Sequence, residues 1–294
     1  MLSRRQFAHI LTVGLVGVTI WYLFIRDKQV PVEAVPEPVL SAGPLPANEQ
    51  FAELARTNPI AALDASLRRY REQVHGYRAV LHKQERIGGK LYEQEGIRIA
   101  FRESPFSVLM LWDNGARRAG LGTVRGSLYV KGQHDGDMIG WRPDAFLKKT
   151  TVSTRESRAR DASRFSIEEF GLYHGALRTY RAWTAARDSG VWNCKYIETK
   201  AIPELDGHVC HVIQRICEPD EFDAFLTGEK PPVAPATTAD SFHTITIMLD
   251  AETWLQTGAI LERANRELVA SYFFRDVQLN PTFPADQFTK EALK

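Results

Sequence analysis

Residues 77–112 have the sequence YRAVLHKQERIGGKLYEQEGIRIAFRESPFSVLMLW, and this stretch decides the fold. Apolar and polar residues alternate along 77–87, 91–102 and 106–112, which is the period of a strand with one buried face. Turn-forming residues separate the runs, beginning with the Gly88-Gly89 pair. Connections as short as these join antiparallel neighbours. The stretch therefore predicts three consecutive strands of an antiparallel meander.

The same two-residue period recurs through the rest of the chain. It predicts further strands at 121–130, 138–141, 191–199, 208–217, 242–250, 255–263 and 268–279. Turns are predicted at 113–115, 134–137 and 205–206. A strongly twisted sheet of about ten strands tends to curl toward a barrel. The predicted fold class is therefore α+β, with a strongly curved antiparallel sheet that forms an incomplete barrel.

Two helices are predicted to cover this sheet. Asn58 and Pro59 are a helix cap and a first-turn proline. The apolar residues that follow recur every three or four positions, at Ile60, Leu63, Leu67, Tyr70 and Val74. The second helix is predicted at 163–187. Both helices place an apolar stripe where it can pack on the sheet.

Composition limits the classes of partner. The chain has 294 residues, with 37 basic and 36 acidic side chains and a net charge of +1. Nucleic-acid binding proteins concentrate Lys and Arg for phosphate contacts, and no such concentration is present. A domain of this length buries enough surface to fold without a metal or a disulfide framework. The sequence therefore predicts a globular domain that does not bind nucleic acid.

The N-terminal segment predicts export. Residues 7–25 carry no charged side chain, and at 1.5 Å per residue they span about 28 Å, enough to cross a bilayer. In front of them, Arg4 and Arg5 stand in Ser-Arg-Arg-Gln-Phe, which matches the core of a twin-arginine export signal. A general secretory signal is the alternative. We expect a protein of the cell envelope, on the periplasmic side of the cytoplasmic membrane.

The predicted organisation has three parts. Residues 1–28 form a signal or signal-anchor, residues 29–47 a Pro-rich spacer, and residues 48–294 the folded domain. The length of the apolar run and its aromatic end favour a retained transmembrane anchor. Small-residue cleavage sites near residues 34 and 42 would release the domain instead, so both fates stay open.

Three cysteines suggest a covalent link. If residues 205–206 form a two-residue turn, Cys194 lies opposite Cys217 across the predicted hairpin, whereas Cys210 points to the other face. A cross-strand disulfide between Cys194 and Cys217 is then feasible. Three unpaired buried thiols are the alternative.

The sequence contains no convincing catalytic or metal-binding pattern. His208, Cys210 and His211 resemble a metal cluster, but alternate residues of a strand face opposite ways, so these three cannot converge. The sequence contains no G-x-S-x-G, P-loop, G-x-G-x-x-G or H-E-x-x-H motif. We expect no catalytic residue, no metal and no cofactor, and a hydrolase is a minor alternative because distant residues can assemble a triad.

One face of the predicted sheet is strongly apolar. Six residues on two neighbouring strands share it: Ile97, Ile99, Phe101, Val108, Met110 and Trp112. An apolar face of this size has to be shielded from water. Either the helices fill the half-barrel completely, or it stays partly open and its apolar hollow takes an acyl chain or a similar ligand.

The C-terminal sequence carries a family resemblance. ELVASYFFRDVQLNP at 267–281, followed by FPADQF at 283–288, resembles the close of LolA/LolB/LppX-like proteins. KQERIGGKL at 83–91, with PFSV at 105–108 and YVKG at 129–132, is similar to an uncharacterised exported bacterial family assigned that fold. The resemblance covers roughly residues 50–290 and carries no catalytic residue.

The resemblance implies a lipid-handling role. In LolA/LolB/LppX-like carriers a helix-covered incomplete barrel holds lipid chains, and several of them move lipids or lipoproteins across the periplasm. The implied partners are a lipid or lipoprotein acyl chain, the cytoplasmic membrane and an envelope protein. The alternative is an envelope interaction or assembly protein whose filled barrel only presents surfaces.

Overall fold

The computed structural model describes residues 37–117, 123–154, 162–222 and 240–294. The chain divides into two units, Met1–Val39 and Leu40–Lys294, and all of the described helices and strands lie in the second unit. Arg4, Arg5 and the apolar run at 7–25 lie outside the described residues, so the export signal and the anchor stay predictions. None of the helices that the structure describes combines the length and apolar character needed to cross a membrane.

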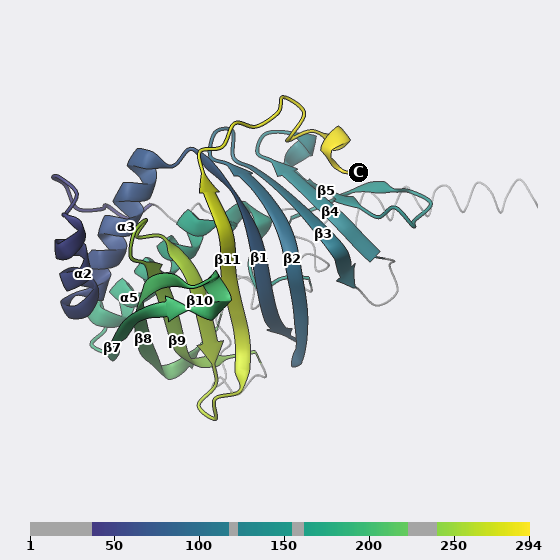
Figure 1. Ribbon diagram of the computed structural model, residues 1–294. Helices are drawn as coiled ribbons and strands as arrows, with labels where there is room; N and C mark the ends of the chain where they lie inside the picture. Colours follow the sequence, from purple (N-terminus) through teal and green to yellow (C-terminus); the bar gives the residue numbers. More distant parts are fainter. Residues whose placement is uncertain (1–36, 118–122, 155–161, 223–239) are drawn as a thin grey trace, which may run out of the picture. The chain divides into compact units, whose positions relative to one another are not determined.

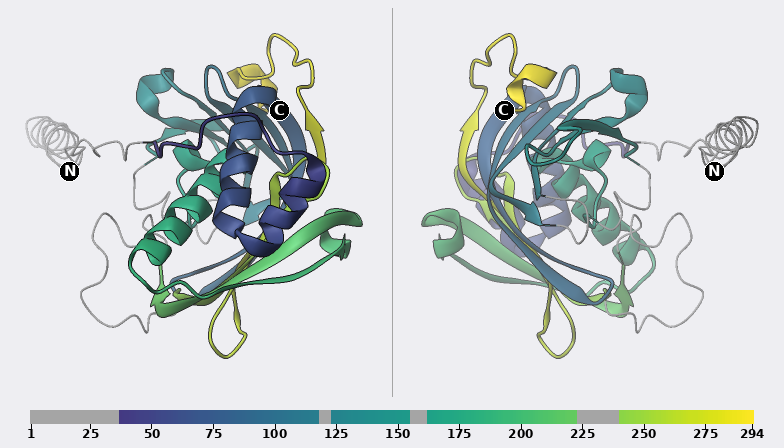
Figure 2. Two further views of the ribbon diagram at one scale, coloured as in Figure 1. Left: turned by 90° about the vertical axis from the view of Figure 1, so that its left-hand side faces the viewer. Right: turned by 90° about the vertical axis from the view of Figure 1, so that its right-hand side faces the viewer.

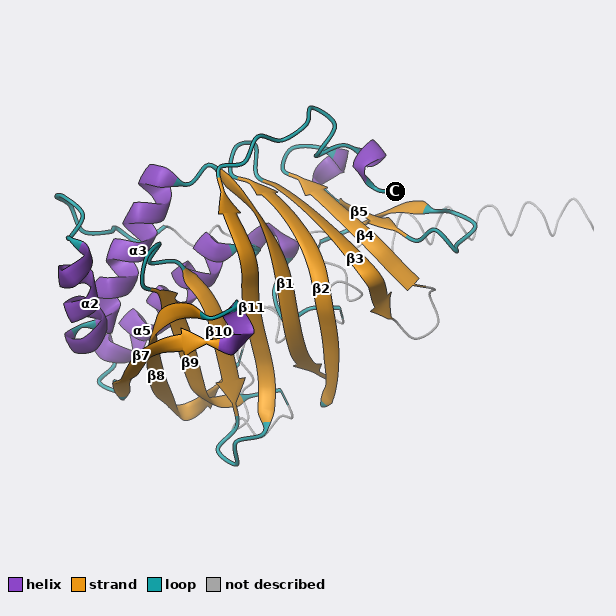
Figure 3. Cartoon of the chain, viewed as in Figure 1, coloured by secondary structure: helices purple, strands orange, loops and turns teal. Residues whose placement is uncertain are grey.

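Within the described residues, eleven strands form one antiparallel sheet (Figure 1, Figure 3). They are β1 (Gly76–Ile87), β2 (Lys90–Arg102), β3 (Ser107–Arg117), β4 (Thr123–Val130), β5 (Met138–Trp141), β6 (Lys149–Val152), β7 (Cys194–Ile202), β8 (His208–Glu221), β9 (Phe242–Asp250), β10 (Gln256–Glu262) and β11 (Leu268–Leu279). The sheet is open, because β6 and β7 are its two edges. The side views in Figure 2 show it curving around the helices. The predicted fold class is confirmed.

The strand order places the first and the last strand at the centre of the sheet. β1 pairs with β2 on one side and with β11 on the other. From this seam, β1 to β6 run outward as one meander, and β11 to β7 run outward as a second. The hairpins were predicted from local turns, whereas the pairing of β1 with β11 has no local signal.

Three α-helices are described: α2 (Asn48–Thr57), α3 (Pro59–Gln73) and α5 (Leu172–Asp188). α3 begins as predicted, with the Asn58 side chain accepting a hydrogen bond from the Ala61 backbone N–H at 3.2 Å. α2 was not predicted. α5 begins nine residues later than predicted, because residues 163–171 run along the concave face of the sheet in bends and a short 3₁₀ turn (Ile167–Glu169).

The helices pack on the concave face of the sheet. Tyr77 of β1 and Phe101 of β2 are fully buried there and stack with their ring centroids 4.8 Å apart. The Tyr77 hydroxyl accepts a hydrogen bond from the Leu172 backbone N–H at 3.2 Å, which fixes the start of α5. Gly171 has φ = +116°, and a Cβ there would lie 2.9 Å from the Tyr77 hydroxyl oxygen. Only glycine fits this close approach.

Two local predictions on β3 to β6 are wrong. Asp113-Asn114-Gly115 is not a turn, because β3 continues through it to Arg117. β6 was missed, since its four residues (Lys149–Val152) are too short for the strand period to stand out.

On the convex face, the C-terminal segment packs Phe288 and Leu293 against Leu109 and Leu128. Both faces of the sheet are therefore partly covered.

The folded unit begins before the predicted boundary at residue 48. Leu45 packs against one core cluster and Leu40 against another, inside the range predicted as a spacer. The buried carboxylate of Asp64 on α3 accepts hydrogen bonds from the Ser41 backbone N–H, at 2.9 Å, and from the Ser41 hydroxyl. These contacts tie residues 40–47 to α3.

We expect Asp64→Ala to lower the free energy of unfolding by about 1–3 kcal/mol, because both Ser41 donors lose their acceptor. Ser41→Ala keeps the backbone bond and removes the hydroxyl, which donates to Asp64 and accepts a bond from the exposed Arg68 guanidinium at 3.2 Å, and should cost about 1 kcal/mol. Urea unfolding of the two variants measures both values. Equal stabilities for Asp64→Ala and the unmodified chain would show that the bonds between Ser41 and Asp64 do not stabilise the fold.

Candidate ligand cavity

A cavity of about 1520 Å³ lies between the concave face of the sheet, α5 and residues 162–171. All three described walls contribute side chains. Its apolar lining includes Leu81, Met110, Trp112, Ile245, Leu261 and Phe274, and its polar lining includes Lys83, Glu85, Gln94, Ser163 and Arg178. α5 contributes to the wall over most of its length, from Leu172 to Trp183.

The six residues predicted to form the apolar hollow share the concave face, as their register requires. Ile97 pairs with Trp112, Ile99 with Met110, and Phe101 with Val108. Only the Met110 and Trp112 side chains lie among the residues that line the cavity. The other four, Ile97, Ile99, Phe101 and Val108, are buried in the core cluster formed with α3 and α5. The helices cover one part of this face, and the cavity occupies the next part.

A β-bulge in β2 changes which residues face the cavity. Leu81 pairs with Ile97, but Lys83 pairs with Gln94, so β2 carries one extra residue between them. Gly96 lies in this bulge with φ = +66°. Beyond it the inward-facing positions become even-numbered, and Lys90, Tyr92 and Gln94 line the cavity. These three residues were not predicted to line a hollow, although a glycine inside a strand pattern is a recognised bulge signal.

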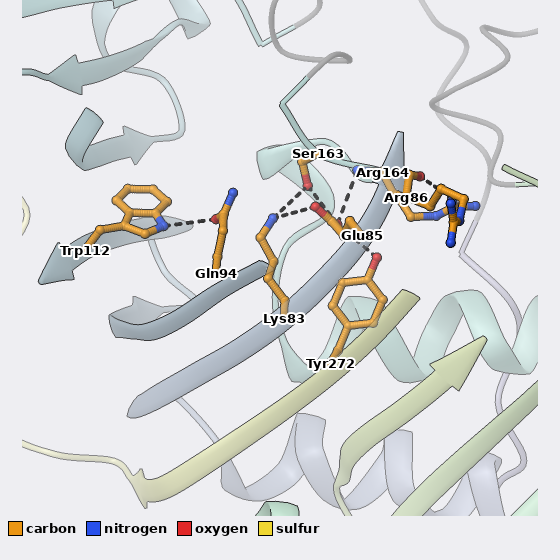
Figure 4. A network of polar contacts seen from close by, with 8 residues as sticks. All are labelled: Lys83, Glu85, Arg86, Gln94, Trp112, Ser163, Arg164 and Tyr272. Carbon is orange, nitrogen blue, oxygen red and sulfur yellow. Dashed lines mark hydrogen bonds and ion pairs between the residues drawn. The ribbon is translucent and has the colours of Figure 1, made fainter. Parts of the chain in front are cut away.

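A polar cluster is buried in the wall of the cavity, centred on Glu85 (Figure 4). Its carboxylate pairs with the Lys83 ammonium at 2.8 Å and accepts hydrogen bonds from the Tyr272 hydroxyl at 2.9 Å and the Ser163 hydroxyl at 3.2 Å. The backbone N–H of Arg164 donates to the same carboxylate at 3.3 Å. A charge this deeply buried is tolerated only when it is paired and hydrogen-bonded, and Glu85 meets that condition.

Arg164 joins three separate segments beside this cluster. Its guanidinium is fully buried and donates to the Arg86 carbonyl oxygen and to the Asp240 carbonyl oxygen, both at 2.8 Å. The Asp240 carboxylate in turn accepts the backbone N–H groups of Gly88 and Gly89 at 2.7 and 2.9 Å. Residues 162–171 are thereby held against the β1–β2 turn. Arg164 was predicted to lie in a helix, and its bonds to these distant segments have no signal in the local sequence.

A second ion pair, between buried Arg215 and half-buried Glu221, lines the cavity on the other meander. Arg215 of β8 is almost fully buried, and its guanidinium makes two hydrogen bonds to the Glu221 carboxylate, at 2.5 and 3.2 Å. Two parallel bonds of this kind fix both side chains in one geometry. The cavity wall therefore carries two paired charge sites within a mainly apolar surface.

The predicted register of the cysteines is wrong. Cys194 lies opposite Arg215, not opposite Cys217, because the chain turns through a 3₁₀ helix (Pro203–Leu205) and β7 carries a bulge between Tyr196 and Glu198. Cys194, Cys210 and Cys217 are free thiols in the structure. As predicted from strand alternation, Cys210 packs in a cluster separate from that of Cys194 and Cys217.

The histidines near Cys210 have other partners. The His208 imidazole lies 3.2 Å from the Asp250 carboxylate, and the His211 ring packs 5.8 Å from the Phe51 ring. Among the described residues, no group of three or more His, Cys, Asp or Glu side chains is placed to hold a metal ion.

Residues 74–292 match the family described as protein of unknown function DUF1571. The chain belongs to this family. The sequence-based assignment to an uncharacterised family is thus confirmed, over nearly the whole of the folded unit. No curated protein matches the sequence.

Several solved structures are similar to the chain. A DUF1329 family protein from Desulfovibrio piger is 14% identical, with a TM-score of 0.36, and the match covers 81% of this chain and 100% of that one. A putative outer membrane lipoprotein-sorting protein domain from Vibrio parahaemolyticus is 12% identical, with a TM-score of 0.34 and coverages of 79% and 97%. The lipoprotein LppX from Mycobacterium tuberculosis is 14% identical, with a TM-score of 0.37 and coverages of 77% and 99%. Likenesses this distant carry no information about a ligand.

The Glu85 cluster predicts a specific pattern of stabilities. Glu85→Leu should lower the free energy of unfolding by about 3–5 kcal/mol, because it leaves the Lys83 ammonium buried without its carboxylate. Lys83→Met combined with Glu85→Leu should recover a large part of this loss, since no unpaired charge remains. Chemical denaturation of both variants measures the difference. A double variant as unstable as the single one would contradict a buried ion pair.

The three cysteines are predicted to react slowly with thiol reagents in the folded chain. Burial raises the pKa of Cys194, Cys210 and Cys217 to about 12, so at pH 8 each stays protonated and holds roughly a thousandfold less thiolate than an exposed cysteine. We expect a thiol reagent to modify the native chain very slowly at pH 8 and rapidly once urea unfolds it. Ala264→Cys, at an exposed turn, supplies the fast control. Rapid labelling of more than this one introduced cysteine in the native protein would contradict the burial of the three native thiols.

Proposed function

We propose that the domain binds a hydrophobic ligand, the acyl chain of a lipid or lipoprotein, in the cavity and acts in lipid or lipoprotein transfer or in envelope assembly. The observation that carries this proposal is the cavity itself. Its volume of about 1520 Å³ exceeds the range of about 300–1,000 Å³ usual for small-molecule sites. Protein interiors are close-packed, with few voids larger than a water molecule, so a cavity of this size supports a ligand site.

The chemistry of the walls favours an acyl chain. Met110, Trp112, Leu81 and Phe274 present apolar surface from three central strands and gain from contact with a chain that excludes water. The Glu85 cluster offers polar atoms at one place on the wall, where the ester or amide end of a lipid could be accommodated. A few convergent polar groups in an apolar pocket are typical of sites that orient their ligand.

The proposed location follows from the N-terminal sequence. Arg4, Arg5 and the apolar run at 7–25 would carry the domain to the periplasmic side of the cytoplasmic membrane, where lipid ligands are available. A retained anchor would make the protein a tethered acceptor or assembly factor, and a cleaved one would make it a shuttle. The size of the cavity weighs against the alternative of an interaction protein with a filled barrel.

The test is the retention of lipid. We expect the full chain, extracted from membranes in mild detergent, to carry a lipid in stoichiometric amount by native mass spectrometry. Met110→Glu should abolish this retention, because a carboxylate in the apolar wall makes burial of an acyl chain unfavourable. Met110→Leu keeps an apolar side chain of similar volume and should retain the lipid.

Ile99→Glu is the matched control for misfolding, because Ile99 faces the same way as Met110 but is buried in the core. It should lower the free energy of unfolding by several kcal/mol, whereas Met110→Glu should cost much less. A chain that folds normally and carries no lipid under any extraction condition would overturn the proposed function.

A further inference from the structure

The hairpin that joins β5 and β6 exposes two large apolar side chains at its tip. Phe146 is 101% exposed and Leu147 is 64% exposed. These are the two most exposed large apolar residues described in the unit Leu40–Lys294. Figure 1 shows the hairpin projecting from the right-hand end of the sheet. Exposed apolar side chains held together on a projection mark a contact site.

The tip is a structured loop. The Arg142 backbone N–H donates to the Lys148 carbonyl oxygen at 2.7 Å, and the Ala145 N–H donates to the Arg142 carbonyl oxygen at 3.2 Å. The Asp144 carboxylate accepts the Thr123 backbone N–H of β4 at 3.3 Å. These bonds close the loop and anchor it to the sheet. The chain thus keeps Phe146 and Leu147 in water although the loop itself is fixed.

The residues around the tip are mainly basic. Arg142, Lys148 and Lys149 flank the apolar pair, and Asp144 is the one acidic residue in this stretch. Lys148 and Lys149 follow Leu147 directly and are exposed. The Lys149 ammonium donates to the Lys290 carbonyl oxygen at 2.5 Å, which holds it beside the tip. An aromatic and an aliphatic side chain with adjacent lysines suit an interface between apolar chains and anionic headgroups.

We propose that Phe146 and Leu147 insert into the surface of a lipid bilayer that carries anionic headgroups, with Lys148 and Lys149 contacting those headgroups. Size favours a bilayer over a protein partner. A stable protein interface buries about 800 Å² on each partner, and two side chains on a narrow tip supply only part of that. A bilayer accepts such a tip because each apolar group leaves water independently.

The same hairpin borders the cavity. Met138 of β5 and Thr150, Thr151 and Val152 of β6 are among its lining residues. Docking through Phe146 would therefore bring one end of the cavity to the membrane surface. Docking at this tip requires only its exposed side chains, its fixed loop and its positive charge, and is independent of the ligand proposed above.

The experiment places a reporter beside the apolar pair. Ala145→Cys in the full chain is labelled with an environment-sensitive fluorophore, and the buried native thiols react slowly enough to leave this site as the labelled one. The labelled protein is mixed with vesicles of phosphatidylcholine alone or of phosphatidylcholine with phosphatidylglycerol. The same label on Ala264→Cys, in the exposed β10–β11 turn, is the matched control. Membrane contact by the N-terminal segment tethers both labelled proteins alike, so docking of the tip is read from the difference between positions 145 and 264.

The label at position 145 should shift its emission to shorter wavelength on the anionic vesicles, while the label at 264 stays as in water. Phe146→Ser with Leu147→Ser should abolish the shift without changing the thermal midpoint, because both side chains are exposed. Lys148→Gln with Lys149→Gln should move the equilibrium of the label about thirtyfold toward water on anionic vesicles.

Three results would overturn the proposal. The first is emission at position 145 that matches the control at 264 on every vesicle, and the second is a shift that survives the double serine substitution. The third is a tip that stays in water on vesicles and becomes shielded only when a second protein is added. Lipid retention in the cavity is measured separately, so failure of docking leaves the ligand proposal intact.

Discussion

The cavity exists because the α-helices fill only part of the space over the concave face of the sheet. Ile97 and Ile99 of β2 are buried in the core cluster with α3 and α5. Their partners across the strand pair, Trp112 and Met110 of β3, line the cavity. α5 and residues 162–171 form further walls of the same cavity and enclose it without filling it.

Much of the fold follows from local sequence signals. The bounds of β5, β9 and β11 match the predicted strands, because their turn residues and two-residue period act over short distances. The start of α3 follows from Asn58 and Pro59 for the same reason. The curved open sheet also follows, since many short strands joined by hairpins leave few other arrangements.

The rest depends on contacts between distant residues. The predicted helix at 163–187 loses its first turns because Arg164 and Ser163 bind Glu85, which lies about 80 positions earlier in the chain. The bulge at Gly96 turns Gln94 toward the cavity and changes the set of lining residues. A prediction that assumes strict alternation of inward and outward residues along β2 cannot locate this switch. The Cys194 register fails likewise, because one bulge and a longer turn move the pairing by two residues.

The central seam also governs how the domain folds. Gln84 of β1 meets Ser271 of β11 across 187 positions of sequence, and every pair along this seam is comparably distant. Contacts this remote are slow to form, because the intervening chain loses its freedom before the pairing is made. The two meanders can form early as hairpins, but β1 stays an unpaired edge on one side until the last strand arrives. A nascent chain therefore exposes an aggregation-prone strand for most of its synthesis, and a chaperone that binds this edge would shield it until β11 is made.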